Sequence, residues 1–394
     1  MSALQPAYVI DAVRTVFGKN RGALSGIRTD DLAALPIRAL AQRHPNLDPA
    51  EIEDVYYGNT NGAGEENRNV ARMAALLAGL PVTVPGVTVN RLCASGAEAF
   101  IQAARAISVG DATLTVAGGV EGMSRAPFVL PRAEEALPRS MRLENTQLGW
   151  RMVNPAFPQE WTTSLGQAAQ QIGAEFGITR EAMDAWAARS HQRVAAAYDA
   201  GLHDGFVLPV GELSRDESLR ATTTPESLAG LKPAFTADGT VTAGNSSPIN
   251  DGALAALIAT AEVAERLGAR PLGRIVGSAT VATSPERFAI APVPAIEKLL
   301  RQRGLDFADI ALWEINEAFA AVVLSCLDQL PAIDPESVNV NGGAIAIGHP
   351  LGASAPRVVV DLCRELRRRG GGYGVAAACI GVGLGQAVLV HVEP

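Results

Sequence analysis

Aromatic and charged residues are scarce in this chain of 394 residues. Aromatic residues make up 5% of it and charged residues 19%, whereas 48% of the residues are hydrophobic. Ala, Val, Ile and Leu therefore supply the apolar bulk, which is typical of packed helices and buried strands and not of a disordered or fibrous chain. The length suffices for two units of core size, so we expect two domains or one fused pair.

An excess of basic residues is also missing. The formal net charge is −8, whereas a nucleic-acid-binding protein would show a basic face, so this class of function is excluded. The acidic balance leaves room for an anionic ligand, because a local cluster of Arg and Lys can hold phosphates within an acidic protein.

A targeting or membrane-spanning segment is not visible. Residues 1–9 lack a charged region followed by an apolar run, which argues against secretion. The longest apolar stretch, residues 373–392, is interrupted by Gly374, Gly381, Gly383 and Gly385. Two buried strands joined by a glycine-rich turn explain this stretch better than a membrane helix. We expect a soluble cytoplasmic protein with no membrane partner.

Cysteine and histidine occur too sparsely to form a disulfide framework or a zinc site. The four cysteines show no Cys-x-x-Cys spacing, and the five histidines do not cluster near them, so we expect reduced thiols and no metal. Cys326 and Cys363 lie among apolar residues, which is typical of cysteines in a hydrophobic core. Cys93 and Cys379 lie in a different context, next to glycine and other small residues.

Short apolar runs alternate with helical patterns, which predicts an α/β fold. In the first third we expect strands at residues 8–10, 54–57, 87–89 and 114–117, and helices at 29–43, 69–80 and 96–109. Thr29 is a candidate N-cap, while Pro36 disfavours the first turns of that helix. The last third repeats the order with a strand at 273–277, a helix at 293–303, and strand-like text at 310–316, 338–341 and 375–379. The shared order predicts an internal duplication of one α/β unit.

The stretch between the two halves differs in character. Residues 124–244 are rich in Pro and Thr and contain one strong helical pattern at 180–200. We interpret them as a loop-and-helix insertion over the active site. A flexible linker is the alternative, but Trp150, Trp161 and Trp186 indicate a packed surface. The expected domains are residues 1–123, completed by about 245–268, then the insertion, and then residues 269–394.

Cys93 lies between a predicted strand and a predicted helix, followed by Ala94, Ser95 and Gly96. A thiol at a helix N-terminus lies beside free N–H groups and the positive end of the helix dipole. This position predicts a stabilised thiolate, with a pKa lowered by one to several units from about 8.5. A small structural cysteine near a turn is the alternative from this segment alone.

Three further segments carry candidate chemistry. Residues 341–354 read as a glycine-rich loop that can present His349 as a base, or as a phosphate cradle that lacks the Lys-Ser/Thr ending of a P-loop. In residues 379–385, alternating glycines let backbone N–H groups face a developing oxyanion after Cys379. Asn316 ends a predicted strand, where a turn or cap role is its commoner use.

Together these segments resemble the thiolase family over nearly the whole chain. Residues 90–96, 316–319, 342–354 and 379–385 match the family's four motifs in the family's order, and residues 240–253 resemble its segment at the coenzyme A site. The resemblance implies a duplicated α/β unit layered α-β-α-β-α. It also implies a homo-dimer or homo-tetramer that uses acyl-CoA and coenzyme A as substrates, without a further cofactor.

The resemblance implies the following acyl transfer. His349 deprotonates Cys93, which attacks the 3-keto carbon of a 3-ketoacyl-CoA, and Cys379 protonates the departing enolate of acetyl-CoA. Asn316, through a water, and His349 serve one oxyanion, and the N–H groups of Cys93 and Gly381 serve the other. A second coenzyme A then removes the acyl group. The positions that match coenzyme A contacts are Arg220, Ser247, Ala243 and Phe319.

The sequence of the insertion resembles one branch of the family and also departs from the family's usual pattern. Residues 148–155 resemble β-ketoadipyl-CoA thiolases, and residues 164–166 lack the His-Met-Gly of acetoacetyl-CoA enzymes. Residues 168–171, Pro248 and Gly122 differ from the residues that thiolases usually carry at these positions. The acyl chain of the substrate is therefore open, and acetoacetyl-CoA formation stays an alternative.

Other reactions on this fold remain alternatives. A ketoacyl synthase would need a second His where Asn316 stands and lacks a counterpart of Cys379. A hydrolase would use Cys93 and His349 with water as the acceptor of the acyl group. A non-catalytic acyl-CoA-binding or lipid-binding protein would need neither a nucleophile nor a base.

Overall fold

One continuous sheet of eleven strands runs through the molecule. The computed structural model describes residues 4–394. The main path of the sheet is β11-β12-β13-β10-β1-β9-β5-β3-β4, with β2 (Gly18–Lys19) paired to β9 and β8 (Val207–Leu208) paired to β1. The strands of this path are β1 (Ala7–Thr15), β3 (Asp54–Gly58), β4 (Val87–Val89), β5 (Leu114–Gly122), β9 (Asn250–Ala259), β10 (Gly273–Ala282), β11 (Ile310–Ile315), β12 (Gly372–Ile380) and β13 (Leu384–Val392).

The two halves of the sheet repeat one pairing pattern. In the first half β3 pairs parallel with β5, β5 antiparallel with β9, and β9 antiparallel with β1. In the second half β11 pairs parallel with β12, β12 antiparallel with β13, and β13 antiparallel with β10. The strands β1 and β10 join the halves through an antiparallel pairing. The predicted duplication is therefore confirmed, and β9 enters the first half from beyond the insertion.

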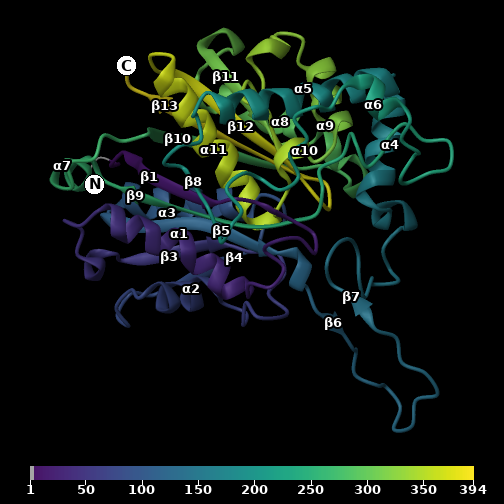
Figure 1. Ribbon diagram of the computed structural model, residues 1–394, viewed down its shortest axis with the longest axis horizontal. Helices are drawn as coiled ribbons and strands as arrows, with labels where there is room; N and C mark the ends of the chain where they lie inside the picture. The colour runs from purple at the N-terminus through teal and green to yellow at the C-terminus, as the bar shows by residue number, and fades with distance from the viewer. Residues whose placement is uncertain (1–3) are drawn as a thin grey trace.

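Helices separate and cover the two halves of the sheet (Figure 1). Between the halves lie α3 (Ser95–Val109) and α11 (Leu351–Arg368), which contact each other, β5 and β12. The outer face of the first half carries α1 (Thr29–Arg43) and α2 (Val70–Ala78), and that of the second half carries α8 (Pro292–Arg303) and α9 (Ala320–Gln329). Three hydrophobic clusters fill the spaces between these layers. The α-β-α-β-α order is therefore confirmed.

Two local expectations were wrong. The helix α1 begins at Thr29 itself, its N-cap is Arg28, and it continues through Pro36, which is buried in the core with Leu32.

Residues 338–341 form no strand, and only Val338 bridges Trp313. The reason lies in Asn339, whose φ is 47° and whose amide donates to the Ile315 carbonyl and accepts from the Ile315 N–H, both at 2.8 Å. The Asn339 side chain thus forms the hydrogen bonds to Ile315 that the backbone of a neighbouring strand would otherwise form.

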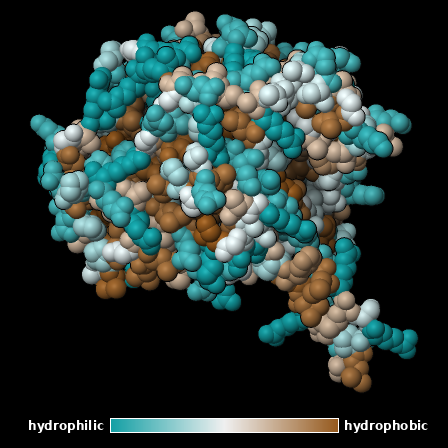
Figure 2. Space-filling view, in the orientation of Figure 1, coloured by the Kyte–Doolittle hydropathy of each residue, from teal (hydrophilic) through white to brown (hydrophobic). Residues whose placement is uncertain are grey.

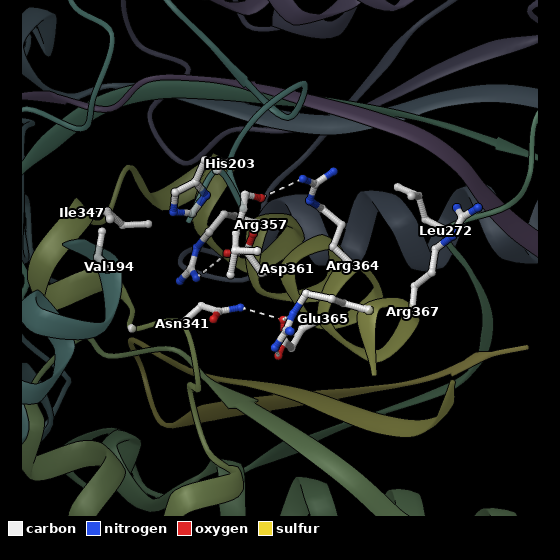
Figure 3. A pocket seen from close by; sticks show the side chains of 14 residues that line it. Val194, His203, Leu272, Asn341, Ile347, Arg357, Asp361, Arg364, Glu365 and Arg367 are labelled. Atoms are coloured by element: carbon white, nitrogen blue, oxygen red, sulfur yellow. Dashed lines mark hydrogen bonds and ion pairs between the residues drawn. The ribbon is translucent and has the colours of Figure 1, made fainter. Parts of the chain in front are cut away.

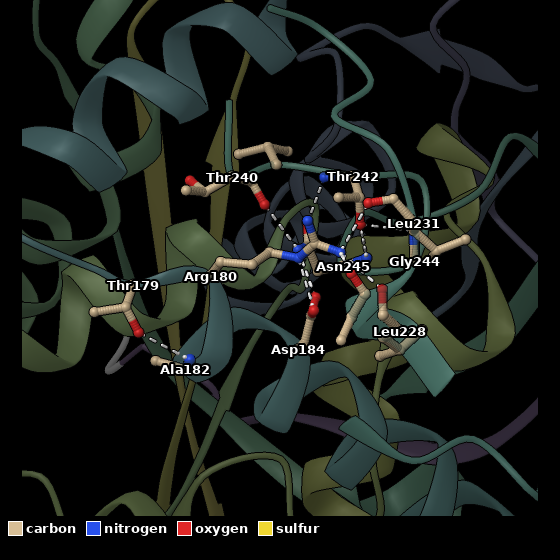
Figure 4. A network of polar contacts seen from close by, with 12 residues as sticks. Thr179, Arg180, Ala182, Asp184, Leu228, Leu231, Thr240, Thr242, Gly244 and Asn245 are labelled. Atoms are coloured by element: carbon tan, nitrogen blue, oxygen red, sulfur yellow. Dashed lines mark hydrogen bonds and ion pairs between the residues drawn. The ribbon is translucent and has the colours of Figure 1, made fainter. Parts of the chain in front are cut away.

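The insertion contains α4 (Leu165–Glu175), α5 (Arg180–Asp199) and α6 (Pro225–Ala229). Figure 4 shows the contacts that join α5 to the segments after it. Arg180 pairs with Asp184 at 2.7 Å and donates to the Leu228 carbonyl at 2.7 Å, while Asn245 donates to the other oxygen of Asp184 at 2.9 Å. These contacts hold the segment that precedes β9 against a helix, so the insertion is a packed unit.

An arm of the insertion projects away from the rest of the molecule (Figure 1). Its base carries the short strands β6 (Phe128–Val129) and β7 (Glu144–Asn145), which pair antiparallel. Figure 2 shows apolar side chains along the arm, and Phe128 is 66% exposed. Only the part of the insertion that follows β7 reaches the site described below.

The remaining helical elements are short. They are α7 (Ala261–Arg266), α10 (Ala344–Ile347) and the 3-10 turns η1 (Pro49–Glu51), η2 (Met123–Arg125), η3 (Gln159–Thr162), η4 (Pro285–Ile290), η5 (Phe307–Asp309) and η6 (Pro335–Ser337). Within residues 4–394, every helix is too short or too polar to cross a membrane.

Candidate active site

Segments from both halves and from the insertion meet at one cavity of about 390 Å³, called the Cys93 cavity below. The turn between β4 and α3 contributes Cys93, and the turn between β12 and β13 contributes Gly381. Residues 146–151 of the insertion close another side, and the remaining lining residues are Thr60, Asn61, Asn90, Leu92, Glu121, Leu165, Leu351 and Val382.

Glycines let the first turns of α3 and α11 approach each other beneath this cavity. A Cβ atom on Gly96 would lie 2.3 Å from the carbonyl oxygen of Gly352, and one on Gly119 would lie 2.0 Å from the same oxygen. Such distances are closer than any side chain tolerates, so glycine is required where these backbones touch. The close approach brings the segments that carry Cys93 and His349 to one place.

Cys93 lies in a tight turn that its neighbours stabilise. Leu92 adopts a positive φ of 47°, and Ser95 accepts from the Arg91 N–H at 2.9 Å while donating to the Leu92 carbonyl at 2.6 Å. The backbone N–H groups of Gly381 and of Cys93 itself lie at the Cys93 sulfur. The sulfur therefore lies beside two donors in a cavity that a substrate can enter.

The expectation of a lowered thiol pKa was wrong. Burial raises the pKa of Cys93 to about 11, the nearby Glu121 adds to the rise, and the two N–H groups offset only part of it. Cys93 is only 6% exposed. The lost solvation of a thiolate at this position therefore outweighs the stabilisation from the N-terminus of α3 at Ser95. Cys93 is thus a neutral thiol in the free protein and needs a base.

His349 makes contacts through both ring nitrogens. Ser354 donates its hydroxyl hydrogen to the Pro350 carbonyl at 2.9 Å, so its oxygen accepts from Nδ1 of His349 at 2.6 Å. This leaves the lone pair on Nε2, which faces Nδ2 of Asn316 at 3.4 Å. Burial, aided by the charge of Arg357, lowers the pKa of His349 to about 3. The imidazole is therefore neutral at neutral pH.

Asn316 and Cys379 are buried, and neither lines the Cys93 cavity. Asn316 follows β11, is fully buried, and its Oδ1 atom has no hydrogen-bond partner within residues 4–394. Cys379 lies in β12, and burial together with the nearby Cys93 raises the pKa of its thiol well above the usual value. The structure thus groups Cys93, Cys379 and Gly381, and separately pairs Asn316 with His349.

The four positions expected to contact coenzyme A are only partly brought together. Ser247 donates through its N–H and its hydroxyl to the Ala318 carbonyl, both at 3.0 Å, next to Phe319. The ring of Phe319 packs edge-on against Phe235 with centroids 5.8 Å apart. Ala243 and Arg220 are exposed on other parts of the insertion, and none of the four lines the Cys93 cavity.

Glu121 is a residue of the cavity that the sequence reasoning missed. It is buried at the end of β5 and accepts from the N–H groups of Thr60, Asn61 and Gly352, each at 3.0 Å. Burial raises the pKa of Glu121 to about 7. A carboxylate directly after the predicted strand and Gly118-Gly119 was the signal that could have identified it. Among residues 4–394, no group of His, Cys, Asp or Glu side chains is arranged to hold a metal ion.

Comparison with known proteins places this geometry in a family. The model of the N-terminal domain of thiolase matches residues 7–262, and that of the C-terminal domain matches residues 269–392. A β-ketoadipyl-CoA thiolase of Acinetobacter baylyi is 46% identical, and the alignment covers 98% of this chain and 100% of the relative. The 3-oxoadipyl-CoA/3-oxo-5,6-dehydrosuberyl-CoA thiolase of Escherichia coli is also 46% identical, with the same coverage.

Solved structures agree with the sequence relatives. The human mitochondrial 3-ketoacyl-CoA thiolase in complex with CoA has a TM-score of 0.92 and 36% identity, covering 100% of this chain and 99% of that one. The acetyl-CoA acetyltransferase of Bacillus anthracis has a TM-score of 0.91 and 37% identity, covering 99% and 100%. With both family models matched over nearly the whole chain, this chain belongs to the thiolase family and is an acyltransferase of that family.

Proposed function

We propose that the chain cleaves a 3-ketoacyl-CoA that carries a terminal carboxylate, such as 3-oxoadipyl-CoA, with coenzyme A as the acyl acceptor. The observation that carries the substrate class is Arg151. Arg151 and the buried Glu121 are the two charged residues that line the Cys93 cavity. The Arg151 side chain forms no ion pair within residues 4–394, so its guanidinium is available to a carboxylate of the acyl chain.

In the proposed reaction, Nε2 of His349 takes the proton of the Cys93 thiol as the sulfur attacks the 3-keto carbon. The C2–C3 bond then breaks, its electron pair goes to C2 of the departing acetyl-CoA enolate, and the Cys379 thiol supplies the proton. Cys379, now a thiolate, takes the proton of the thiol of a second coenzyme A as this sulfur attacks the Cys93 thioester. The bond between the acyl group and Cys93 breaks, and His349 returns its proton to the Cys93 sulfur. No resident cofactor enters these steps.

The pKa values support this division of work. Cys93 and Cys379 are both neutral thiols in the free protein and His349 is a neutral imidazole, so each starts in the protonation state that the first step needs. The N–H groups of Cys93 and Gly381 lie at the sulfur and are placed to stabilise an oxyanion that forms there. The orphaned Oδ1 of Asn316 fits a water that serves the other oxyanion.

Coenzyme A contacts at Arg220, Ser247, Ala243 and Phe319 are part of the proposal. A human relative was solved in complex with CoA, which supports coenzyme A as a ligand, and Ser247 lies next to Phe319 here. The homo-dimer or homo-tetramer and the cytoplasmic location stay predictions.

The test compares two substrates of equal chain length, 3-oxoadipyl-CoA and 3-oxohexanoyl-CoA. A charge-assisted contact contributes about 1.5–3 kcal/mol, so Arg151→Gln should lower kcat/KM for 3-oxoadipyl-CoA by about 10- to 100-fold. The value for 3-oxohexanoyl-CoA should change by less than about twofold, because that chain has no carboxylate. Arg139→Gln, on the exposed arm outside the cavity, is the matched control.

Equal losses on both substrates would refute the assigned role of Arg151. Preference for acetoacetyl-CoA over both would favour the acetoacetyl-CoA alternative. Intact mass measurement should show an acyl adduct that coenzyme A removes and that Cys93→Ala prevents. Absence of the adduct with every substrate would overturn the thiolase reaction itself.

A further inference from the structure

The buried carboxylate of Glu317 joins separate parts of the chain, and the proposed acyl transfer gives it no role. Glu317 follows β11 and is 1% exposed. Its Oε1 atom accepts from the ring N–H of Trp186 in α5 at 2.9 Å and from the Asn339 amide at 3.1 Å. These two contacts connect the end of β11 with the insertion.

The other oxygen of Glu317 holds the segment that precedes His349. Oε2 accepts from the Ile345 N–H at 3.2 Å and from the Ser190 hydroxyl at 2.7 Å. Ser190 in turn accepts from the Gly343 N–H at 3.0 Å. A Cβ atom on Gly343 would lie 2.6 Å from the Glu317 carboxyl carbon, so glycine is required where the carboxylate reaches this backbone. Glu317 is therefore tied to the segment once directly and once through Ser190.

A cavity of about 430 Å³ borders the same segment, and Glu317 does not line it. It lies along α11, and three residues of the segment line it, Asn341, Gly342 and Ile347 (Figure 3). Asn341 donates to Glu365 in α11 at 3.1 Å, which anchors the start of the segment. Atoms that face a cavity lose dispersion contacts, so packing holds the rest of the segment less firmly than a closed core would. Its position therefore depends on the hydrogen bonds to Glu317.

The two residues that Glu317 restrains through the backbone face each other. Asn316 is its neighbour in the chain, and His349 follows shortly after Ile345. Nδ2 of Asn316 and Nε2 of His349 lie 3.4 Å apart, which is long for a hydrogen bond. At that distance, a small displacement of the Ile345 backbone is enough to break the contact.

We propose that Glu317 is a positioning residue that holds Asn316 and His349 in register for the proposed reaction. Glu317 does not line the Cys93 cavity, so it acts through the two backbone segments that it joins. Its contacts with Trp186 and Ser190 also make the position of this pair depend on α5 of the insertion. The role rests on the proposed acyl transfer.

The imidazole nitrogen signals of protein labelled with ¹⁵N-histidine test the positioning without any turnover. The chain has five histidines, and His349→Gln identifies the Nε2 signal of His349. Asn316→Ala removes the N–H donor and marks the signal of an Nε2 atom that lacks this hydrogen bond. Glu317→Gln should move the Nε2 signal toward that mark.

The expected shift follows from the donors around Glu317. Ser190 is the one donor of the four that can also accept, so the amide of the Glu317→Gln side chain turns toward it. That orientation leaves the Ile345 N–H without its acceptor. Steady-state kinetics on 3-oxoadipyl-CoA should show kcat lowered by about 10- to 100-fold and KM within about twofold, because the facing pair is displaced and substrate binding is not.

Trp186→Phe is the matched control. It removes a donor from the same carboxylate, but from the oxygen that does not contact the segment before His349. Its Nε2 signal should stay in place and its kcat within about twofold, although thermal unfolding should occur at a lower temperature in both variants. Equal losses of kcat in Trp186→Phe and Glu317→Gln would overturn the proposal, because they would show a structural role only.

Ser190→Ala is the second variant and decides the matter if Glu317→Gln does not fold. It removes the link to Gly343 and should shift the Nε2 signal of His349 in the same direction. An unmoved signal in the folded variants contradicts the proposal. If the unsubstituted protein cleaves no 3-ketoacyl-CoA, the proposed reaction fails, and the nitrogen signals still decide whether Glu317 positions the pair.

Discussion

Nδ1 of His349 lies 2.6 Å from the hydroxyl oxygen of Ser354, and this contact decides which imidazole nitrogen is free. Ser354 donates its only hydroxyl hydrogen to the Pro350 carbonyl, so it accepts from Nδ1 and leaves the lone pair on Nε2, the nitrogen that we propose acts as the base. A residue five positions away in the sequence thereby selects the tautomer of His349. In the proposed reaction Ser354 is a positioning residue, since it contacts His349 and not the reacting atoms.

Ser354→Ala should lower kcat by about 10- to 100-fold with little change in KM, because the imidazole loses the partner that fixes its tautomer. Steady-state kinetics on 3-oxoadipyl-CoA measures the split. Ser325→Ala is the control, since Ser325 is equally buried and its hydroxyl has no partner within residues 4–394. Its kcat should be unchanged. A matching loss in both variants would show that packing, and not the tautomer, is responsible.

Alkylation of Cys93 by iodoacetamide should accelerate about tenfold for each pH unit between pH 7 and 9.5, because the reactive thiolate is a minor species below the raised pKa. Burial places that pKa at about 11 in the free protein. Peptide mass spectrometry follows the modified residue, and Cys93→Ser gives the background from the other buried cysteines. A plateau of the rate below pH 9 would contradict the raised pKa.

Glu121 should make the protein less stable as the pH rises. Its pKa is about 7 in the folded state against the usual 4.5, so its stabilising contribution is complete below about pH 4.5 and is lost as the pH passes 7. A shift of this size corresponds to roughly 3 kcal/mol. Urea unfolding at pH 5 and pH 8 should show this loss, and Glu121→Gln should reduce it.

The comparison within each variant separates titration from lost contacts. Glu121→Gln also disturbs hydrogen bonds from Thr60 and Gly352, but that cost is present at both pH values. Glu135→Gln, on the exposed arm, should keep the full pH dependence. An unchanged pH dependence in Glu121→Gln would disprove the assignment.

The buried pair of Arg14 and Asp216 should be essential for stability. Two contacts of 2.7 Å join these side chains, both fully buried, and fix the insertion to β1. Arg14→Met should lower the free energy of unfolding by about 3–5 kcal/mol, because the Asp216 carboxylate is left buried and unpaired. Arg266→Met, which breaks an exposed pair with Glu51, should cost less than about 1 kcal/mol. Urea denaturation would measure both, and similar losses would contradict this account.

The periodicity of apolar residues predicted helices and strands well where neighbouring residues alone determine their bounds. The helix at residues 29–43 and the strand at 87–89 have the expected bounds, because side-chain spacing and turn residues determine them. The error at residues 338–341 arose because Asn339 forms its bonds with Ile315, a partner that periodicity does not reveal. A short stretch of sequence can show that a segment is extended, but it does not show which groups form hydrogen bonds with its backbone.

The site was predictable in its residues but not in its electrostatics. The family motifs contain Cys93, His349 and Cys379, of which Cys93 lines the cavity and the other two are buried outside its lining. The pKa of Cys93 depends instead on desolvation by the whole fold, which reverses the effect expected from the helix start. Glu121 was missed for the same reason, since its partner Gly352 comes from the other half of the chain.

The position of β9 imposes an order on how the chain can be made. This strand lies between β1 and β5, yet it is translated only after the whole insertion. Until Ala259 has left the ribosome, β1 and β5 both present unpaired backbone edges that invite aggregation. At about 5–20 residues per second this interval lasts on the order of ten seconds. Fragments that stop before Asn250 therefore lack the strand that joins β1 to β5, and we expect them to aggregate.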